Sequence, residues 1–485
     1  MAGTIQSIDS ILIGGAWTER PDRDVIEVTN PSDGSVIAHV AEATVADADA
    51  AVAAARRAFD DGPWPRMSYD ERAAIVNAIA DRLDARADDV IRASIADLGI
   101  PRGFAEAINP LFSAILRDNA SLAGELAERS HQERTGMGSR VVVLREPGGV
   151  AVCIVPWNAP VLLAATKAGA ALMAGCTVVV KVDPNAPLGA LVLAEACAEA
   201  GLPGGVISFL PAGREVGERL VAHPDVDHVS FTGSSATGRA VMASAAANLT
   251  RVTLELGGKS AGIMLEDMDP AEALPTLFAG CLGMSGQICT LLSRILVPAA
   301  RYQEWEAALA GFYAAQGIGD ADLATTSQGP LVSERQLERV AALVDSARAE
   351  GARIVTGGRR PEGLTGWFYE PTLIADVTPE MRIVQEEAFG PVTVLMPYDS
   401  VDEAIAIANA SEYGLAGAIF THDRDRAFAI GVRLRAGAIS WNGFGCCPTQ
   451  PFGGYKQSGM GREGGIEGVE AFLEVKQFAN GVGVV

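Results

Sequence analysis

From residue 150 to residue 256, short apolar runs alternate with longer segments of helical spacing. The runs are rich in β-branched residues, which is typical of strands buried on both faces of a sheet. They predict strands at 150–155, 177–181, 206–210, 228–231 and 251–256, with helices at 160–174, 188–200, 215–222 and 236–247 between them. Strands joined by helices form parallel sheets with right-handed crossovers, so we predict an α/β fold for this region.

A second alternation follows and predicts a second parallel-sheet α/β unit. Its helices are predicted at 270–283, 301–315, 333–350 and 401–410, and its strands at 293–297, 353–356 and 392–398. The N-terminal part adds an Ala-rich helix at 45–58, a long helix at 69–97 and an isolated strand at 141–144. The 485 residues are too many for one ordinary core, which is consistent with two such domains.

The chain carries a formal net charge of −22. An acidic surface repels phosphate groups, so we expect neither nucleic acid nor an anionic membrane as a partner. Residues 147–166 form an uncharged run of about membrane-spanning length, but Pro147, Pro156 and Pro160 interrupt it. Because a helix does not continue through these prolines, we predict a strand, a loop and the start of a helix.

Cysteine usage points to a reducing compartment. There are seven cysteines, an odd number, without the C-x-x-C spacing of a metal site. The N-terminus also lacks the basic-then-apolar pattern of a secretory signal. We therefore expect a cytoplasmic protein with unpaired thiols and no metal. The adjacent Cys446 and Cys447 are interpreted as incidental.

Cys289 is the strongest candidate for a nucleophile. Its thiol lies in the glycine-flanked segment 286–292, and the carboxylate of Glu255 lies in the glycine turn 254–259. A thiol attacks as the thiolate, and a nearby base can accept its proton. The pair does not decide the function alone, because most cysteines are small buried hydrophobes.

Four further segments change this interpretation. They are Pro156-Trp157-Asn158, Phe231-Thr232-Gly233-Ser234, 385–391 and 451–459. With the segments around Glu255 and Cys289, their order and separation resemble those of the aldehyde dehydrogenase superfamily. The resemblance extends from about Leu12 to nearly the C-terminus.

The resemblance implies a Rossmann-like cofactor domain, a catalytic α/β domain and a small antiparallel oligomerisation flap. The cofactor domain would comprise residues 1–128 and 147–257, and the catalytic domain residues 258–456. The flap would comprise residues 129–146 and 472–485, and in the family it mediates homodimers and homotetramers.

The reaction implied is NAD(P)-dependent oxidation of an aldehyde to a carboxylic acid. The Cys289 thiolate would add to the carbonyl, hydride would leave for nicotinamide, and water would hydrolyse the resulting thioester. Asn158 and the backbone N–H of Cys289 match the oxyanion donors, and Glu255 matches the general base. Lys167 and Glu463 match a second polar cluster near the base, for proton relay.

Each of these positions has a structural alternative when only the residues are considered. Asn158 could be a turn residue before Pro160, and Glu255 could be a surface carboxylate. Lys167 and Glu463 could form a structural ion pair.

The resemblance also assigns cofactor contacts. Glu387 and Phe389 match the nicotinamide-ribose site, and Lys181 matches a lysine that reaches the adenosine ribose. Gly233 and Ser234 open a helix, whose N–H groups and dipole suit a pyrophosphate. The remaining expected contacts are Ile154, Trp157, Gly213, Arg214, Phe231, Gly238 and Leu256.

One departure from the family bears on the choice between NAD and NADP. Many NAD-preferring members carry Glu three residues after the lysine, where this chain has Pro184. A carboxylate there binds ribose hydroxyls and repels a 2′-phosphate. We favour NAD, with Asp183 as a partial substitute, whereas Arg214 leaves NADP open.

The substrate tunnel is predicted to be wide and apolar. Its expected wall residues are Phe112, Ala159, Leu163, Thr166, Ile288, Thr290 and Phe444. Well-known members often carry aromatic side chains at Ala159 and Thr166. Because the wall lacks Lys and Arg, we expect a neutral, bulky, apolar or aromatic aldehyde in preference to an acid semialdehyde.

Two other functions remain open. A CoA-acylating relative would transfer the thioester to CoA, but such relatives typically lack a glutamate at the position of Glu255. A non-enzymatic relative of the fold would not need Cys289 and Glu387 together.

Overall fold

The computed structural model describes residues 8–19, 24–136, 139–445 and 447–479. Within them, the largest sheet has eight strands in the order β19-β11-β10-β7-β8-β9-β1-β2. Its strands are β1 (Ser10–Ile13), β2 (Ala16–Glu19), β7 (Val150–Ile154), β8 (Thr177–Val182), β9 (Ile207–Pro211), β10 (His228–Thr232), β11 (Arg251–Glu255) and β19 (Gly459–Met460). Strands β7 to β11 are parallel, whereas β1 and β19 join them antiparallel. The five strands predicted from the first alternation are confirmed.

Helices cover both faces of this sheet. They are α1 (Val45–Asp60), α2 (Tyr69–Asp84), α3 (Ala87–Leu98), α4 (Arg102–Ser121), α5 (Ala123–Ser130), α6 (Pro160–Ala174), α7 (Leu188–Glu199), α8 (Arg214–Val221) and α9 (Ser235–Ala245). Ala151 and Cys153 of β7 face a core shared with α2, α4, α6 and α7. Val150 and Val152 face a core shared with α1, α8 and α9. Burial on both faces explains why these strands are continuous apolar runs.

The single helix predicted at 69–97 is wrong, because the chain forms α2 and α3 instead. The break lies at Arg86, which has φ −110° and ψ 18°. Its guanidinium donates a 2.6 Å hydrogen bond to Glu199 of α7 and lies 3.5 Å from Glu195. This contact with another helix is invisible to a periodicity argument.

The second sheet has seven strands in the order β14-β15-β16-β13-β12-β17-β18. They are β12 (Ala261–Met264), β13 (Arg294–Pro298), β14 (Arg353–Thr356), β15 (Thr372–Ala375), β16 (Val392–Tyr398), β17 (Ala416–Phe420) and β18 (Ala438–Trp441). The helices of this region are α10 (Pro270–Leu277), α11 (Tyr302–Ala314), α12 (Glu334–Ala349), α13 (Arg382–Gln385), α14 (Val401–Asn409) and α15 (Arg424–Gly431). All pairings except β14 with β15 are parallel.

The helix predicted at 270–283 is also wrong in part. Helix α10 ends at Leu277, a wider π-helical turn follows at Phe278–Leu282, and a short turn follows at Gly283–Gly286. Pro275 lies inside α10 and has no N–H to donate, which weakens the regular ladder. The chain is therefore free to change direction before it reaches Cys289.

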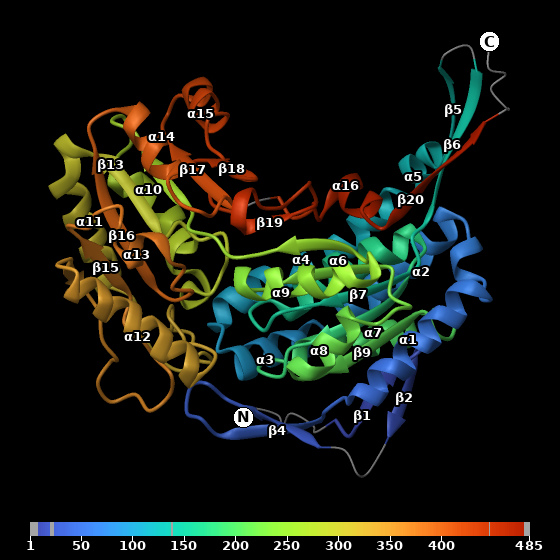
Figure 1. Ribbon diagram of the computed structural model, residues 1–485. Coiled ribbons are helices and arrows are strands. Elements are labelled where there is room, and N and C mark those ends of the chain that lie inside the picture. The colour runs from blue at the N-terminus through green and yellow to red at the C-terminus, as the bar shows by residue number, and fades with distance from the viewer. Residues whose placement is uncertain (1–7, 20–23, 137–138, 446, 480–485) are drawn as a thin grey trace.

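Two antiparallel sheets complete the fold. A flap contains β5 (His131–Gly136), β6 (Ser139–Pro147) and β20 (Leu473–Ala479), and a hairpin contains β3 (Val25–Thr29) and β4 (Val36–Ala41). In Figure 1 the flap projects from the body of the first sheet, on the side away from the second sheet. Residues 137–138, 446 and 480–485, which include parts of the predicted flap and Cys446, lie outside the described residues. The predicted fold class is confirmed.

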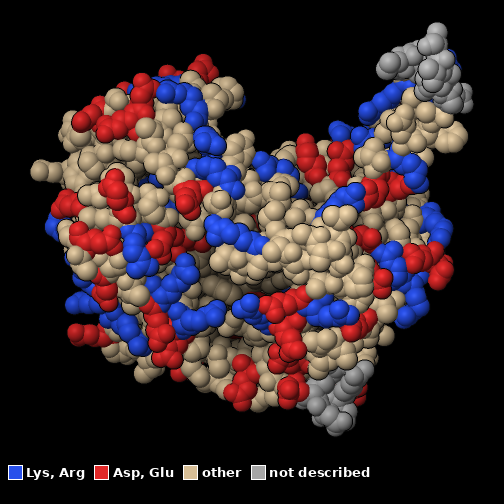
Figure 2. Space-filling model, in the orientation of Figure 1, with Lys and Arg blue, Asp and Glu red and all other residues tan. Residues whose placement is uncertain are grey.

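The two α/β bodies meet around a shared apolar cluster. Ile95 and Leu98 of α3 pack there with Met284 and Val332, and Trp157 and Ile288 lie at its edge. Figure 2 shows a hollow of mostly uncharged residues between the two bodies. None of the helices in the described part of the chain is long and apolar enough to cross a bilayer.

Candidate active site

Cys289 follows a backbone segment of unusual conformation. Met284, Ser285 and Gly286 have φ values of +50°, +53° and +80°. The hydroxyl of Ser285 donates a 2.8 Å hydrogen bond to the carbonyl of Gly329, which helps hold this conformation. A Cβ on Gly286 would collide with the backbone of Gly390, so the segment lies directly against the 385–391 block.

Asn158 lies beside this segment. It is 7% exposed, in the loop between β7 and α6, and its Nδ2 donates a 3.0 Å hydrogen bond to the carbonyl of Gln287. The side chain of Gln287 accepts the N–H of Val332 and donates to the carbonyl of Met284. Sequence reasoning paired Asn158 with Cys289 but missed Gln287, which fixes the backbone between them.

Glu255 ends β11 and pairs with Gly459 of β19. Ser458 fixes the following turn, because its hydroxyl donates to the carbonyl of Gly257 at 2.6 Å and accepts the N–H of Gly414 at 2.9 Å. The Glu255 residue is 3% exposed, and neither carboxyl oxygen has a hydrogen-bond partner.

Burial raises the pKa of the Glu255 carboxyl well above its usual range. The negative charge of Glu463 acts in the same direction, whereas the charges of Lys167 and Arg462 oppose it. A carboxyl with a raised pKa takes up a proton more readily than an ordinary glutamate, which suits a general base.

Lys167 and Glu463 form a buried ion pair through Nζ and Oε1. Ser230 of β10 joins them, since its hydroxyl donates to Glu463 Oε1 at 2.9 Å and accepts from Lys167 Nζ at 3.0 Å. The structure thus brings the two predicted residues together, and it adds Ser230, which no sequence motif indicated.

Glu387 lies against the glycine turn 254–259. Its Oε1 accepts the N–H of Gly258 at 3.0 Å, and a Cβ on Gly257 would collide with its carboxylate. Glu387, Phe389 and Cys289 line one pocket. Burial raises the pKa of Glu387 to about 7.

The predicted pyrophosphate site lies at the start of α9. Ser234 caps the helix and accepts the N–H of Thr237 at 3.2 Å. A Cβ on Gly233 would collide with the ring of Phe231, and one on Gly238 would collide with Leu256. These glycines keep the helix N-terminus close to the sheet, as the diphosphate of a dinucleotide requires.

Ile154 and Trp157 lie between this helix and Cys289. Ile154 ends β7 and pairs with Phe231 of β10, so both residues stand at the carboxyl edge of the sheet. The ring of Trp157 meets that of Phe389 edge-on, with centroids 5.3 Å apart. The rings join the loop after β7 to the 385–391 block.

Lys181 is buried on β8, and burial lowers its pKa. Gly213 precedes α8, and its N–H donates a 3.1 Å hydrogen bond to Glu42. The Arg214 side chain is 87% exposed and pairs with Glu218 at 2.7 Å. Sequence reasoning missed Glu42, which stands outside every motif.

Comparison with known proteins agrees with this geometry. The Aldehyde dehydrogenase family model matches residues 17–478. A geranial dehydrogenase of Castellaniella defragrans is 41% identical over 96% of this chain and 97% of the relative, and a chloroplastic betaine aldehyde dehydrogenase of Beta vulgaris is 38% identical over 97% and 96%. A solved Mycobacterium tuberculosis aldehyde dehydrogenase complexed with NAD+ is similar at a TM-score of 0.95, with 45% identity over 99% of each chain. This chain belongs to the aldehyde dehydrogenase family.

The family and the enzyme class predicted from the sequence are thereby confirmed. In this family member the predicted substrate residues lie in two groups. The first group lies at and just after the start of α6 and consists of Ala159, Leu163 and Thr166. The hydroxyl of Thr166 donates a 2.9 Å hydrogen bond to the carbonyl of Leu162. Phe112, on α4, is 5% exposed and packs in the core with α6.

The second group surrounds the nucleophile of this family member. Ile288 packs at the edge of the cluster between the two bodies. Phe444 lies against Gly280, and Gly445 next to it lies near the hydroxyl of Thr290. A further aromatic residue, Phe104 of α4, lies close to Gly283, as Ile288 does. No motif in the sequence indicated Phe104.

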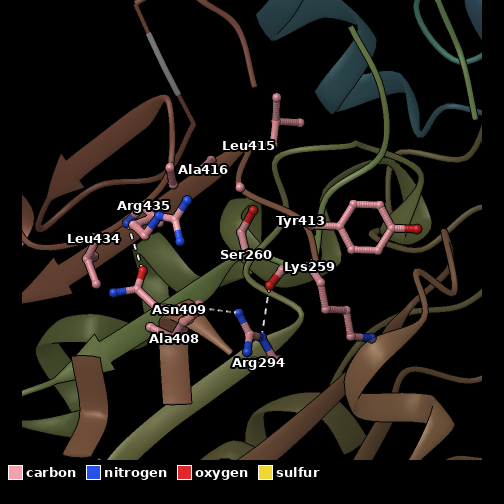
Figure 3. Close-up of a pocket in the computed structure, with 14 residues that line it drawn as sticks. Lys259, Ser260, Arg294, Ala408, Asn409, Tyr413, Leu415, Ala416, Leu434 and Arg435 are labelled. Atoms are coloured by element: carbon pink, nitrogen blue, oxygen red, sulfur yellow. Dashed lines mark hydrogen bonds between the residues drawn. The ribbon is translucent and has the colours of Figure 1, made fainter. Parts of the chain in front are cut away.

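Figure 3 shows a second pocket, behind the glycine turn of this family member. Arg294 crosses it and donates to the carbonyls of Lys259, Ile407 and Ala408 at 2.8–2.9 Å. Two of these carbonyls belong to the last turn of α14, where the regular helical ladder ends and the Ile407 carbonyl also accepts the N–H of Ala410, at 3.3 Å. Burial, together with the charge of Arg294, lowers the pKa of Lys259 to about 7. The hydrogen bonds of Arg294 thus anchor the chain that continues from Gly258.

Replacing Glu463 by Gln should destabilise the protein by about 3–5 kcal/mol, because the change leaves the ammonium of Lys167 buried without its counter-ion. Urea unfolding followed by circular dichroism measures this loss. The matched control is Glu146→Gln, which removes the partner of exposed Lys476 and should cost less than about 1 kcal/mol. Equal losses in both variants would contradict the importance of the buried pair.

Proposed function

We propose that this protein oxidises a bulky, apolar or aromatic aldehyde to the carboxylic acid with NAD+, through a thioester on Cys289. The observation that carries this proposal is the convergence of three chain segments at one thiol. The 286–290 segment touches the Asn158 loop through Gln287 and the 385–391 block through Gly390. The glycine turn after Glu255 approaches the carbonyl of Cys289 itself.

Cys289 is the attacking group. Its thiolate adds to the carbonyl carbon, and the carbonyl oxygen becomes an oxyanion. Asn158 is positioned to stabilise this charge, since only one N–H of its amide is used by Gln287. Hydrogen bonds aimed at a developing charge lower the barrier most when, as here, the donor is already held in place.

The residues at the sheet edge fit NAD+. The start of α9 would hold the diphosphate, Lys181 the adenosine ribose and Glu387 the nicotinamide ribose. NAD+ bound there would supply the acceptor for the hydride that leaves the substrate carbon. The related Mycobacterium tuberculosis structure holds NAD+, which supports the same cofactor here.

Glu255 would activate the water that hydrolyses the thioester. Its carboxyl stands without a hydrogen-bond partner, so an incoming water would find an open acceptor. The neighbouring Lys167, Glu463 and Ser230 would carry the released proton away from it. A glutamate in this position favours free acid over a CoA thioester as the product.

The side chains near the nucleophile support a bulky substrate. Ala159, at the start of α6, has a small side chain, and it is apolar and only partly buried, as are Leu163 and Ile288. The relatives include a geranial dehydrogenase, whose name indicates a terpenoid aldehyde.

The flap supports assembly into a homodimer or homotetramer. Val475 and Phe478 of β20 are 67% and 69% exposed, and such apolar side chains are normally covered by a partner. Sedimentation of the full chain distinguishes a dimer from a tetramer.

Replacing Cys289 by Ala should lower turnover by about 10⁴-fold or more, because the thiol is a reactant. NADH binding, followed by fluorescence, should stay near wild type, since the thiol is not expected to bind the cofactor. Cys447→Ala is the control and should keep full activity, because its side chain is exposed. The assay uses octanal and benzaldehyde, with and without CoA. Activity near wild type in Cys289→Ala would refute the thioester mechanism, and product formation that requires CoA would favour the acylating class.

Replacing Glu255 by Gln should slow deacylation by about 10²–10⁴-fold and leave acylation much faster. Stopped-flow traces should then show a rapid burst of NADH before a slow steady state. Because burial raises the pKa of Glu255, its carboxylate form increases as pH rises, and wild-type deacylation should rise with it. That pH dependence should disappear in the variant. An equally slowed burst would assign the base to another residue.

The wild-type kcat/KM should rise by about 10²-fold from acetaldehyde to medium-chain, aromatic or terpenoid aldehydes, since each buried methylene contributes about 0.8 kcal/mol. Ala159→Phe should lower kcat/KM for the bulky substrates by about 10-fold and spare acetaldehyde, which does not need the space. Succinate semialdehyde serves as the charged comparison. If it or acetaldehyde were the best substrate, the tunnel would not be wide and apolar.

A further inference from the structure

Glu42 lies across the carboxyl ends of β8 and β9. It follows β4, and the next residue, Ala43, donates its N–H to the carbonyl of Pro211 at 2.8 Å. Its own Oε1 accepts the N–H of Gly213 at 3.1 Å. The backbone after Glu42 is therefore held at the end of β9, and its carboxylate is held at the turn before α8.

Lys181 stands at the same edge of the sheet. It pairs with Leu210 of β9, one residue before Pro211. Its Cε lies about 4.0 Å from the place of a Cβ on Gly217, so the side chain extends along the start of α8. Burial lowers the pKa of Lys181, and the charges of Asp183 and then of Glu42 oppose this effect, as expected for nearby carboxylates.

Two other charged groups near Lys181 have partners of their own. Asp183 Oδ1 accepts both the N–H and the side-chain amide of Asn185, at 3.0 and 2.7 Å. The guanidinium of Arg214 points into solvent and pairs with Glu218. In Glu42, Oε1 accepts the N–H of Gly213, and this hydrogen bond fixes the orientation of the whole carboxylate, Oε2 included.

We propose that Glu42 makes this protein prefer NAD over NADP, by accepting a hydrogen bond from the 2′-hydroxyl of the adenosine ribose and repelling a 2′-phosphate. The carboxylate would come from the N-terminal segment, in place of the residue that Pro184 occupies. This inference rests on the proposed function, because it assumes that Lys181 marks the adenosine end of the cofactor. A carboxylate on a ribose diol is a general means of excluding the 2′-phosphate.

Glu42→Gln tests the inference, because Gln keeps an acceptor for Gly213 and removes the charge. NADH and NADPH are titrated separately into the full-length protein without aldehyde, and binding is read from nucleotide fluorescence. Wild type should bind NADH at least about 10-fold more tightly than NADPH, and the variant should lose about 10-fold or more of this ratio. Glu42→Asp, which retains the charge, should keep the preference for NADH.

Glu27→Gln, which removes an exposed carboxylate from β3 of the same hairpin, is the matched control and should leave the ratio within about twofold. A wild type that binds NADPH as tightly as NADH, or a ratio unchanged in Glu42→Gln, would overturn the inference and leave the proposed function standing. A wild type that binds neither nucleotide would refute the proposed function itself. Because the wild-type ratio is informative alone, the test does not depend on the variant folding.

Discussion

The site depends on backbone segments that pack together with no side chain between them. A Cβ on Gly258 would collide with the carbonyl of Cys289, and one on Gly286 would collide with Gly390. Interiors are close-packed, so a methyl group at either place would push the thiol away from the groups around it. This close packing is accompanied by left-handed backbone at Met284 and Ser285, which destabilises the fold by about 1–3 kcal/mol for each residue.

The buried charges around the thiol fall into two kinds. Glu463 is paired with Lys167 and accepts a hydrogen bond from the hydroxyl of Ser230. Glu255 is buried nearby without a hydrogen-bond partner, and the charge of Glu463 makes its ionisation harder still. Two carboxyls with such different surroundings are suited to different tasks, one structural or relaying and one basic.

The cofactor edge shows how distant parts of the chain share one site. Strands β7, β8, β10 and β11 end at the same edge because they are parallel, and the loops that follow them carry Asn158, Gly233 and the glycine turn. Glu42 reaches this edge from the hairpin of β3 and β4, through its bond to Gly213. Ligands bind at such an edge because the strand ends bring loops and helix N-termini together there.

The sequence by itself determined the first sheet and the family. Strands β7 to β11 are short, β-branched apolar runs between helical segments, so composition and spacing predict them, and six ordered segments indicate Cys289, Glu255 and Asn158. It did not determine β12 and β15, because each follows another strand and not a helix, so neither belongs to the regular alternation of strands and helices.

The tertiary structure alone decided the break at Arg86, the turn after Leu277, and the positions of Ser230 and Glu42. Arg86 leaves helical geometry where its side chain pairs with α7, a contact more than a hundred residues away along the chain. Ser230 and Glu42 are single polar residues without characteristic neighbours, and only long-range packing brings them to Lys167 of α6 and to Gly213 before α8. Local pattern reports which surfaces must be buried, whereas the partner of each buried or charged group is chosen by long-range packing.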